Sequence, residues 1–130
     1  MSKQSATARI LALSRIWSPC NLSGYQKELR KLPGIDPARI GIMGFSLGGG
    51  VTLRTAMETN RQTWMAAEKG FATHVAFYPV CKPFIKRLEN SGSALTGAPM
   101  IIFYGTEDVY GEGKAVPKLK RRLQKSTILK

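Results

Sequence analysis

The pentapeptide G-F-S-L-G at residues 44–48 is the feature that most constrains how this chain can fold. It follows an apolar run from Arg39 to Met43 and precedes a stretch compatible with a helix. Glycines on both sides of the serine allow a bend that would be too tight for residues with a Cβ atom. The pattern therefore predicts a strand, a sharp turn with Ser46 at its tip and then a helix, which is the geometry of a nucleophile elbow.

The rest of the chain alternates between apolar runs and helix-compatible stretches. Short β-branched and aromatic runs predict strands at 39–45, 71–78 and 99–104. Helices are predicted at 23–32, 47–59 and 116–124, a polar loop at 88–96, and the opening of a further strand at 126–129. Strands that alternate with helices predict an α/β fold with a parallel sheet.

The first predicted helix starts with a capping box. Ser23 is expected to be the N-cap, with Gln26 at the third helical position reaching back to it. The apolar residues at 25, 29 and 32 then fall on one helical face, and Pro33-Gly34 ends the segment. In the second helix the glycines at 48–50 lower helix propensity, but they allow close packing of helix against strand.

Composition limits the class of protein. With 130 residues the chain is at most one domain, and we expect a basic, poorly ordered segment over 1–21 and a folded domain over 22–130. No apolar run approaches the roughly 20 residues of a membrane-spanning helix, so no membrane partner is expected. The two cysteines, Cys20 and Cys81, do not make a disulfide framework, which favours a reduced, cytoplasmic protein.

The net charge of +12 comes from 20 Lys and Arg residues against 8 Asp and Glu residues. Seven of the basic residues lie between Lys114 and Lys130. Binding to a nucleic acid or an anionic surface would account for such an excess. Because no nucleic-acid-binding motif accompanies the charge, we expect a solvated helix face and a basic terminus, without a nucleic-acid partner.

The order of these motifs resembles that of the dienelactone hydrolase family of α/β-hydrolases over residues 22–125. The segment I-D-P-A-R-I-G-I-M-G-F-S at 35–46 is similar to the approach to that family's elbow, and F-Y-P at 77–79 to the end of its next strand. The segment from G-A-P at 97–99 to G-T-E-D at 105–108 is similar to the strand and loop that carry its acid. The resemblance implies a partial α/β-hydrolase fold, three-layered with a short parallel sheet. It also implies hydrolysis of an ester or lactone without a metal or other cofactor.

The resemblance implies roles for three residues. Ser46 takes the place of the nucleophile, which is usually cysteine in dienelactone hydrolases proper and serine in wider relatives. Asp108 takes the place of the acid that orients the catalytic imidazole, although its position near Gly105 also suits a turn, and Glu107 is its nearest substitute. The backbone N–H of Leu47 takes the place of one half of the oxyanion hole.

The chain departs from the family pattern at its general base. In this fold the histidine follows the acid along the chain, whereas the only histidine here, His74, precedes Asp108 and lies within a predicted strand. A core position is expected for His74. Three or four N-terminal strands of the family also have no counterpart. The sequence is therefore interpreted as a hydrolase fragment that is impaired or inactive in this form.

Two other interpretations stay open. A truncated or decayed hydrolase core would have no turnover and would self-associate through exposed sheet edges. A nucleotide-binding protein of the short-chain dehydrogenase kind would use the glycines at 44, 48 and 50 and the pair Tyr78-x-x-x-Lys82. Pro79 counts against the latter, because it disfavours a helix that would place Tyr78 and Lys82 on one face. No acid near position 65 follows a second strand to bind a ribose hydroxyl.

Overall fold

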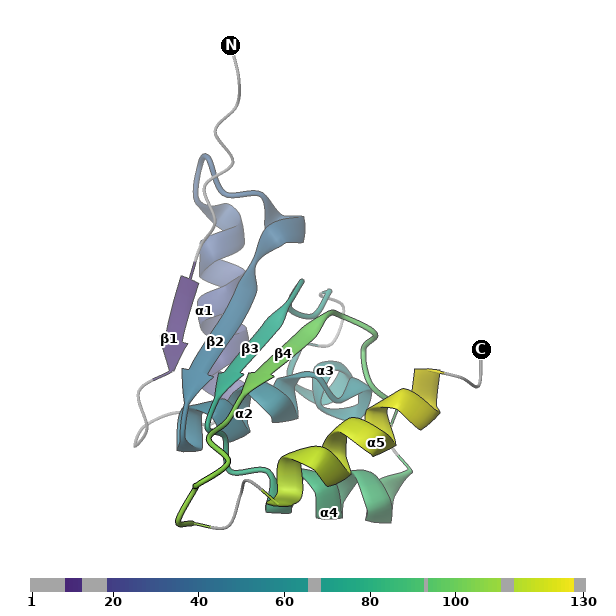
Figure 1. The fold of residues 1–130 in the computed structure, drawn as a ribbon. Helices are drawn as coiled ribbons and strands as arrows, with labels where there is room; N and C mark the ends of the chain where they lie inside the picture. Colours follow the sequence, from purple (N-terminus) through teal and green to yellow (C-terminus); the bar gives the residue numbers. More distant parts are fainter. Residues whose placement is uncertain (1–8, 13–18, 66–68, 93, 111–113, 128–130) are drawn as a thin grey trace.

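The computed structural model of the chain describes residues 9–12, 19–65, 69–92, 94–110 and 114–127. Four parallel strands form one sheet in the order β1-β2-β3-β4 (Figure 1). The elements, in chain order, are β1 (Arg9–Ala12), α1 (Pro19–Lys31), the 3₁₀ turn η1 (Pro37–Arg39), β2 (Gly41–Phe45), α2 (Leu47–Thr55), α3 (Glu58–Met65), β3 (His74–Phe77), α4 (Lys82–Ser91), β4 (Met100–Phe103) and α5 (Ala115–Thr127). The predicted α/β fold with a short parallel sheet is confirmed.

The strand register divides the side chains of the sheet between two faces. The two rows that face the helices are Ile42, His74 and Met100, followed by Gly44, Ala76 and Ile102. On β2 and β3 these residues are buried. Figure 1 shows α1, α2 and α3 behind the sheet on this side. A right-handed connection between neighbouring parallel strands leads to this one-sided arrangement, because each strand pairs with the next in chain order.

The opposite face of the sheet carries a row of stacked aromatic rings. Phe45 and Phe77 have ring centroids 4.8 Å apart at an interplanar angle of 16°, and Phe77 and Phe103 lie 4.8 Å apart at 12°. Phe45 is 38% exposed and Phe103 is 50% exposed. Parallel sheets are commonly covered on both faces. The described residues therefore form a partial α/β-hydrolase fold with two of its three predicted layers.

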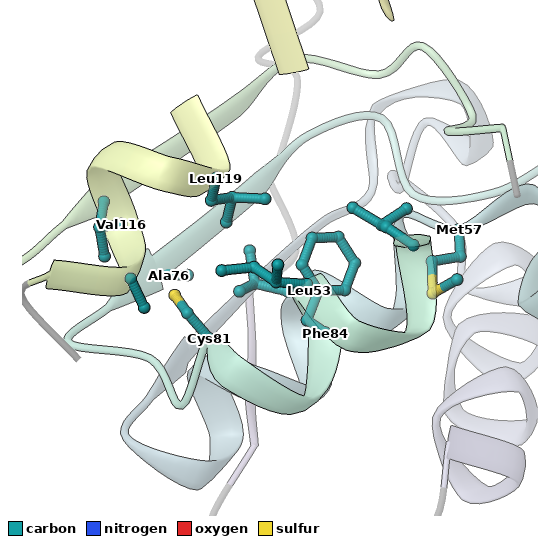
Figure 2. Close-up of a cluster of buried hydrophobic side chains, with 10 residues drawn as sticks. Leu53, Met57, Ala76, Cys81, Phe84, Val116 and Leu119 are labelled. Carbon is teal, nitrogen blue, oxygen red and sulfur yellow. The ribbon is translucent and has the colours of Figure 1, made fainter. Parts of the chain in front are cut away.

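The larger core cluster joins α2, α4 and α5 to β3 and β4 (Figure 2). Leu53 of α2 and Leu119 of α5 are fully buried, and Phe84 of α4 is 1% exposed. Cys81, immediately before α4, is also fully buried in this cluster. Cys81 therefore fills a small apolar position of the core.

Helix α1 differs from its sequence-based prediction. It begins at Pro19, and proline is favourable in the first helical position because it lacks only an N–H that has no partner there. Ser23 therefore lies inside the helix, and its prediction as N-cap was wrong. Of the predicted apolar face only Leu29 packs against a core cluster, and the prediction was wrong for the other two residues. Tyr25 and Leu32 are more than half exposed, whereas Leu22 and Gln26 are buried.

Helix α4 was not predicted at all. It covers Lys82–Ser91, so the loop predicted at 88–96 is helical in its first part. Pro83 lies in the first turn of α4, where proline is tolerated. The apolar residues Phe84, Ile85 and Leu88 then share one buried face.

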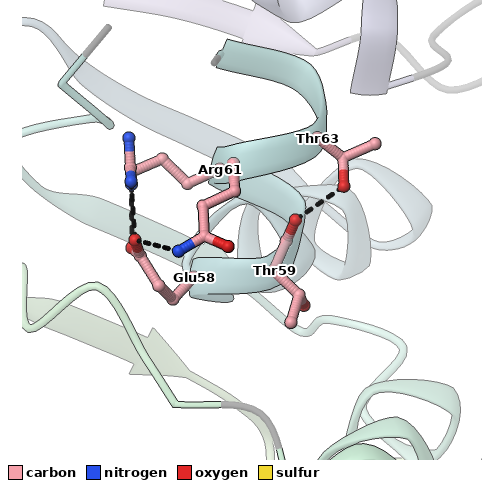
Figure 3. Close-up of polar contacts among 5 residues, drawn as sticks. Glu58, Thr59, Arg61 and Thr63 are labelled. Atoms are coloured by element: carbon pink, nitrogen blue, oxygen red, sulfur yellow. Dashed lines mark hydrogen bonds and ion pairs between the residues drawn. The ribbon is translucent and has the colours of Figure 1, made fainter. Parts of the chain in front are cut away.

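The helix predicted at 47–59 is divided in two. Helix α2 ends at Thr55, Met57 forms an isolated antiparallel bridge with Leu95, and α3 starts at Glu58. An ion pair between Glu58 and Arg61, with an N···O distance of 2.6 Å, stabilises the first turn of α3 (Figure 3).

The last helix is longer than predicted, and the N-terminal segment contains a strand. Helix α5 is confirmed, but it extends to Thr127, so the start of a strand predicted at 126 was wrong; residues 128 and 129 lie outside the described residues. Strand β1 lies within the segment 1–21 that was expected to be poorly ordered, and it pairs with β2. In the described part of the chain β1 and β4 form the sheet edges. Self-association through such edges stays a prediction.

His74 lies in the core between the sheet and the helices, as expected. It is fully buried, and neither ring nitrogen has a hydrogen-bond partner of good geometry among the described residues. Burial lowers the pKa of His74 from 6.5 to about 4, and the nearby carbonyls of Pro99 and Thr55 offset only part of this shift. The imidazole is therefore neutral in the folded protein at pH 7.

Stability should consequently fall as the pH is lowered from about 6.5 towards 4. In this window the unfolded chain binds a proton on His74 that the folded chain does not bind, so the free energy of unfolding rises with pH. The full shift corresponds to roughly 3 kcal/mol. Urea unfolding at several pH values should show this dependence in the wild type and a much flatter profile in His74→Leu. Equal profiles for the two proteins would show that His74 does not carry the effect.

Candidate functional site

Ser46 occupies the bend between β2 and α2. Its backbone angles are φ 52° and ψ −117°, a region that residues with a side chain rarely adopt. Such a conformation costs about 1–3 kcal/mol and persists only where the surrounding structure holds it. The predicted strand, turn and helix are therefore present around a strained serine.

Backbone hydrogen bonds fix this bend from both sides. The N–H of Ser46 donates to the carbonyl of Phe77 at 3.0 Å, which extends the pairing of β2 with β3 by one residue. The carbonyl of Ser46 accepts from Gly50 at 3.0 Å and from Val80 at 3.4 Å. The serine is thus tied to its own helix and to the neighbouring strand end.

Glycines let α2 approach the sheet. A Cβ atom on Gly44 would collide with the carbonyl of Gly48 and would lie 2.7 Å from the Oγ1 atom of Thr52. A Cβ atom on Gly49 would lie 2.9 Å from the side chain of Pro79. The expected close packing of α2 against the sheet is confirmed, and Gly44 is a steric requirement of the turn.

The carboxyl ends of β2, β3 and β4 meet at one edge of the sheet, and a cavity of about 760 Å³ lies there. It is lined by Ser46, Leu47, Tyr78, Val80, Gly105, Glu107, Asp108, Val109 and Tyr110. Ligands of open parallel sheets bind at this edge in general. The structure therefore brings Ser46, Leu47 and Asp108, the three residues singled out from the sequence, to one cavity.

Asp108 lies in the loop after β4. One of its carboxylate oxygens accepts the backbone N–H of Tyr110 at 2.9 Å, which is the turn geometry that the sequence also suggested. The side chain is only partly exposed and lines the cavity beside Glu107. Asp108 therefore holds a turn and lies at the same cavity as Ser46.

A family model for the dienelactone hydrolase family matches residues 21–129. The chain belongs to this family. No curated protein and no solved structure matched it. Membership confirms the resemblance and indicates a hydrolase of the α/β-hydrolase type. It agrees with the geometry, since the match includes the bend at Ser46 and the loop of Asp108.

Leu47 is the first residue of α2 in this dienelactone hydrolase family member. The first N–H groups of a helix have no acceptor within the helix, and the helix dipole adds partial positive charge at this end. The N–H of Leu47 thus lies beside Ser46 and is able to donate a hydrogen bond to an anion there.

His74 is not part of this cavity. It begins β3, whereas the cavity lies beyond the end of that strand at Phe77. At about 3.3 Å per residue these two positions are roughly 10 Å apart. The buried imidazole faces the helices and does not reach Ser46.

Tyr78, Val109 and Tyr110 line the cavity but were not identified as site residues from the sequence. Their position after parallel strands would have indicated it, because such strand ends share an edge.

Tyr78 has a positive φ of 35°, and its N–H donates to the carbonyl of Phe103 at 2.6 Å. Tyr78 lies outside α4, which begins at Lys82. The two residues do not share a helix face, so the dehydrogenase interpretation lacks the geometry it needs.

Two kinds of feature are absent from the described residues. No cluster of three or more His, Cys, Asp or Glu side chains there is arranged to hold a metal ion. None of the helices in the same part of the chain has the length and apolar character to cross a membrane.

The steric role of Gly44 gives a direct test of the bend. Gly44→Ala should destabilise the protein by roughly 2–3 kcal/mol, because the new methyl group meets backbone that cannot move without shifting α2. Gly24→Ala is the matched control. Nothing lies within 4 Å of a Cβ atom at Gly24 inside α1, so this change should stabilise by about 0.5–1 kcal/mol. Urea unfolding followed by circular dichroism measures both, and equal effects would contradict the packing described for α2.

Proposed function

We propose that this member of the dienelactone hydrolase family hydrolyses a small ester or lactone through Ser46 as nucleophile. The observation that carries the proposal is the strained bend at Ser46. This bend places Ser46 at the wall of a cavity that Asp108 also lines. Strain of this kind clusters at functional sites. The apolar walls at Leu47, Val80 and Val109 fit the hydrocarbon part of an ester.

The proposed chemistry is acyl transfer. The Oγ atom of Ser46 forms a bond to the carbonyl carbon of the substrate, and the alcohol oxygen leaves with a proton to give an acyl-enzyme. Water then cleaves the acyl-enzyme and restores the serine. Negative charge that develops on the carbonyl oxygen would be stabilised by the N–H of Leu47.

The hydroxyl proton of Ser46 needs an acceptor, and no histidine of this chain lies close enough to act as that general base. Its single histidine is buried in the core away from the cavity. A serine hydrolase without its base retains only the part of catalysis that comes from binding and the oxyanion hole, about 10³–10⁴-fold over water. We therefore propose that this chain by itself is strongly impaired, and a non-catalytic fragment is the second candidate.

Hydrolysis of 4-nitrophenyl acetate, followed by release of nitrophenolate, tests the role of Ser46. We expect turnover below about 1 s⁻¹, the lower end of typical enzyme rates. Added imidazole supplies a diffusible base and should raise the rate of the wild type more than that of Ser46→Ala. Wild-type turnover above about 1 s⁻¹ without imidazole would contradict the proposal that this chain has no general base for Ser46. Equal rates for the wild type and Ser46→Ala at all imidazole concentrations would favour the non-catalytic candidate.

A second substitution separates the two roles of Asp108. Asp108→Asn keeps an oxygen that can accept the N–H of Tyr110, but it removes the charge that would orient and stabilise an imidazolium. If Asp108 acts as the acid, the imidazole-dependent part of the rate should fall about tenfold or more. The control is Asp36→Asn, because Asp36 accepts the N–H of Ala38 at 2.9 Å in a similar turn away from the cavity. An imidazole-dependent rate that is the same in both variants would leave Asp108 with its turn role alone.

A further inference from the structure

A second cavity lies along one face of α4, at the end of α2 that is remote from Ser46. Its volume is about 400 Å³. Arg54 from α2 lines it together with residues 83, 86, 87, 90 and 91 of α4. The spacing of the α4 residues places them on one helical face. The cavity shares no lining residue with the cavity of Ser46. Arg54 follows Ser46 by eight residues, roughly 12 Å along α2.

The charges that line this cavity are all positive. Arg54, Lys86 and Arg87 contribute three cations, and no carboxylate is among the lining residues. The single acid of α4, Glu89, forms an ion pair with Lys118 of α5 at 2.9 Å. Within the described part of the chain the two helices therefore supply no counter-charge to the cavity.

The excess of positive charge affects Arg54 directly. Its side chain is partly buried, and burial followed by the charge of Arg87 lowers the pKa of its guanidinium. A second positive charge beside a partly buried cation is unfavourable unless an anion compensates it.

Helix dipoles do not account for the arrangement. Arg54 lies in the last turn of α2, where a cation is favourable. Arg87, by contrast, lies before the last turn of α4, and that turn contains no basic residue. The dipole explains one cation but not the convergence of three on one cavity.

We propose that this cavity binds a phosphate group, presented as free phosphate or as a small phosphate monoester. Guanidinium groups donate two parallel hydrogen bonds to phosphate oxygens, and the side-chain amide of Asn90 adds a neutral donor on the same wall. A polynucleotide is disfavoured, since such partners engage about 6–10 phosphates along an extended surface and this cavity offers three cations.

The test is an NMR titration of the full chain with inorganic phosphate and with phenyl phosphate, at an ionic strength held constant with sodium chloride. We expect the backbone amide signals of Arg54, Arg87 and Asn90 to shift with an apparent Kd of about 1 mM or lower for at least one probe. Tighter binding of phenyl phosphate would identify a monoester, and tighter binding of inorganic phosphate would identify the free ion. Arg87→Gln should weaken binding roughly tenfold, because it removes a charge-assisted hydrogen bond.

The matched control is Lys27→Gln, which removes one exposed charge from α1 and should leave the affinity unchanged. Three results would overturn the proposal. These are the absence of shifts at these amides with either probe, an equal loss of affinity in Arg87→Gln and Lys27→Gln, or binding of a 12-nucleotide single-stranded DNA that both variants weaken equally.

Discussion

The backbone of Ser46 is the point on which the rest of this structure depends. Its N–H bonds to the end of β3, and its carbonyl accepts from the first turn of α2 and from the segment after β3. These bonds hold a positive φ that would otherwise relax. Because α2 starts at the next residue, the same bend sets the direction of the helix, the position of the N–H of Leu47 and the shape of the cavity.

Packing around α2 covers one face of the sheet and leaves the other largely open. Gly49 and Gly50 bring α2 into contact with Pro79 and Val80, so the helical side is dense. On the other side Phe45 is 38% exposed, Phe103 is 50% exposed and Phe77 is partly buried, so the three rings together leave on the order of 200 Å² in water. At about 25 cal/mol per Å² this forgoes several kcal/mol of burial free energy. The core between the sheet and the helices must supply the stability instead.

The sequence indicated the bend, β2, β3 and β4 because each has a local cause: paired glycines, or a short apolar run bounded by turn residues. It did not indicate α4, because a proline close to a predicted strand is typical of a loop as well as of the first turn of a helix, where Pro83 lies. The buried face of α1 depends on its contacts with Phe71 and Ile40 across the second core cluster, and no local pattern reports such contacts. Tyr78 and Tyr110 carry no motif of their own, and only their position after parallel strands, whose ends share an edge, points to the cavity.

The parallel register also explains why one histidine cannot serve both the fold and the chemistry. Every strand of the sheet runs in the same direction, so residues at strand ends gather at the Ser46 edge and residues at strand starts gather at the opposite edge. His74 starts β3 and lies in one row with Ile42 and Met100, facing the helices. A rotamer change cannot move its ring along the strand by three residues. Its imidazole fills a core position that disfavours a proton, whereas a general base must accept one near neutral pH.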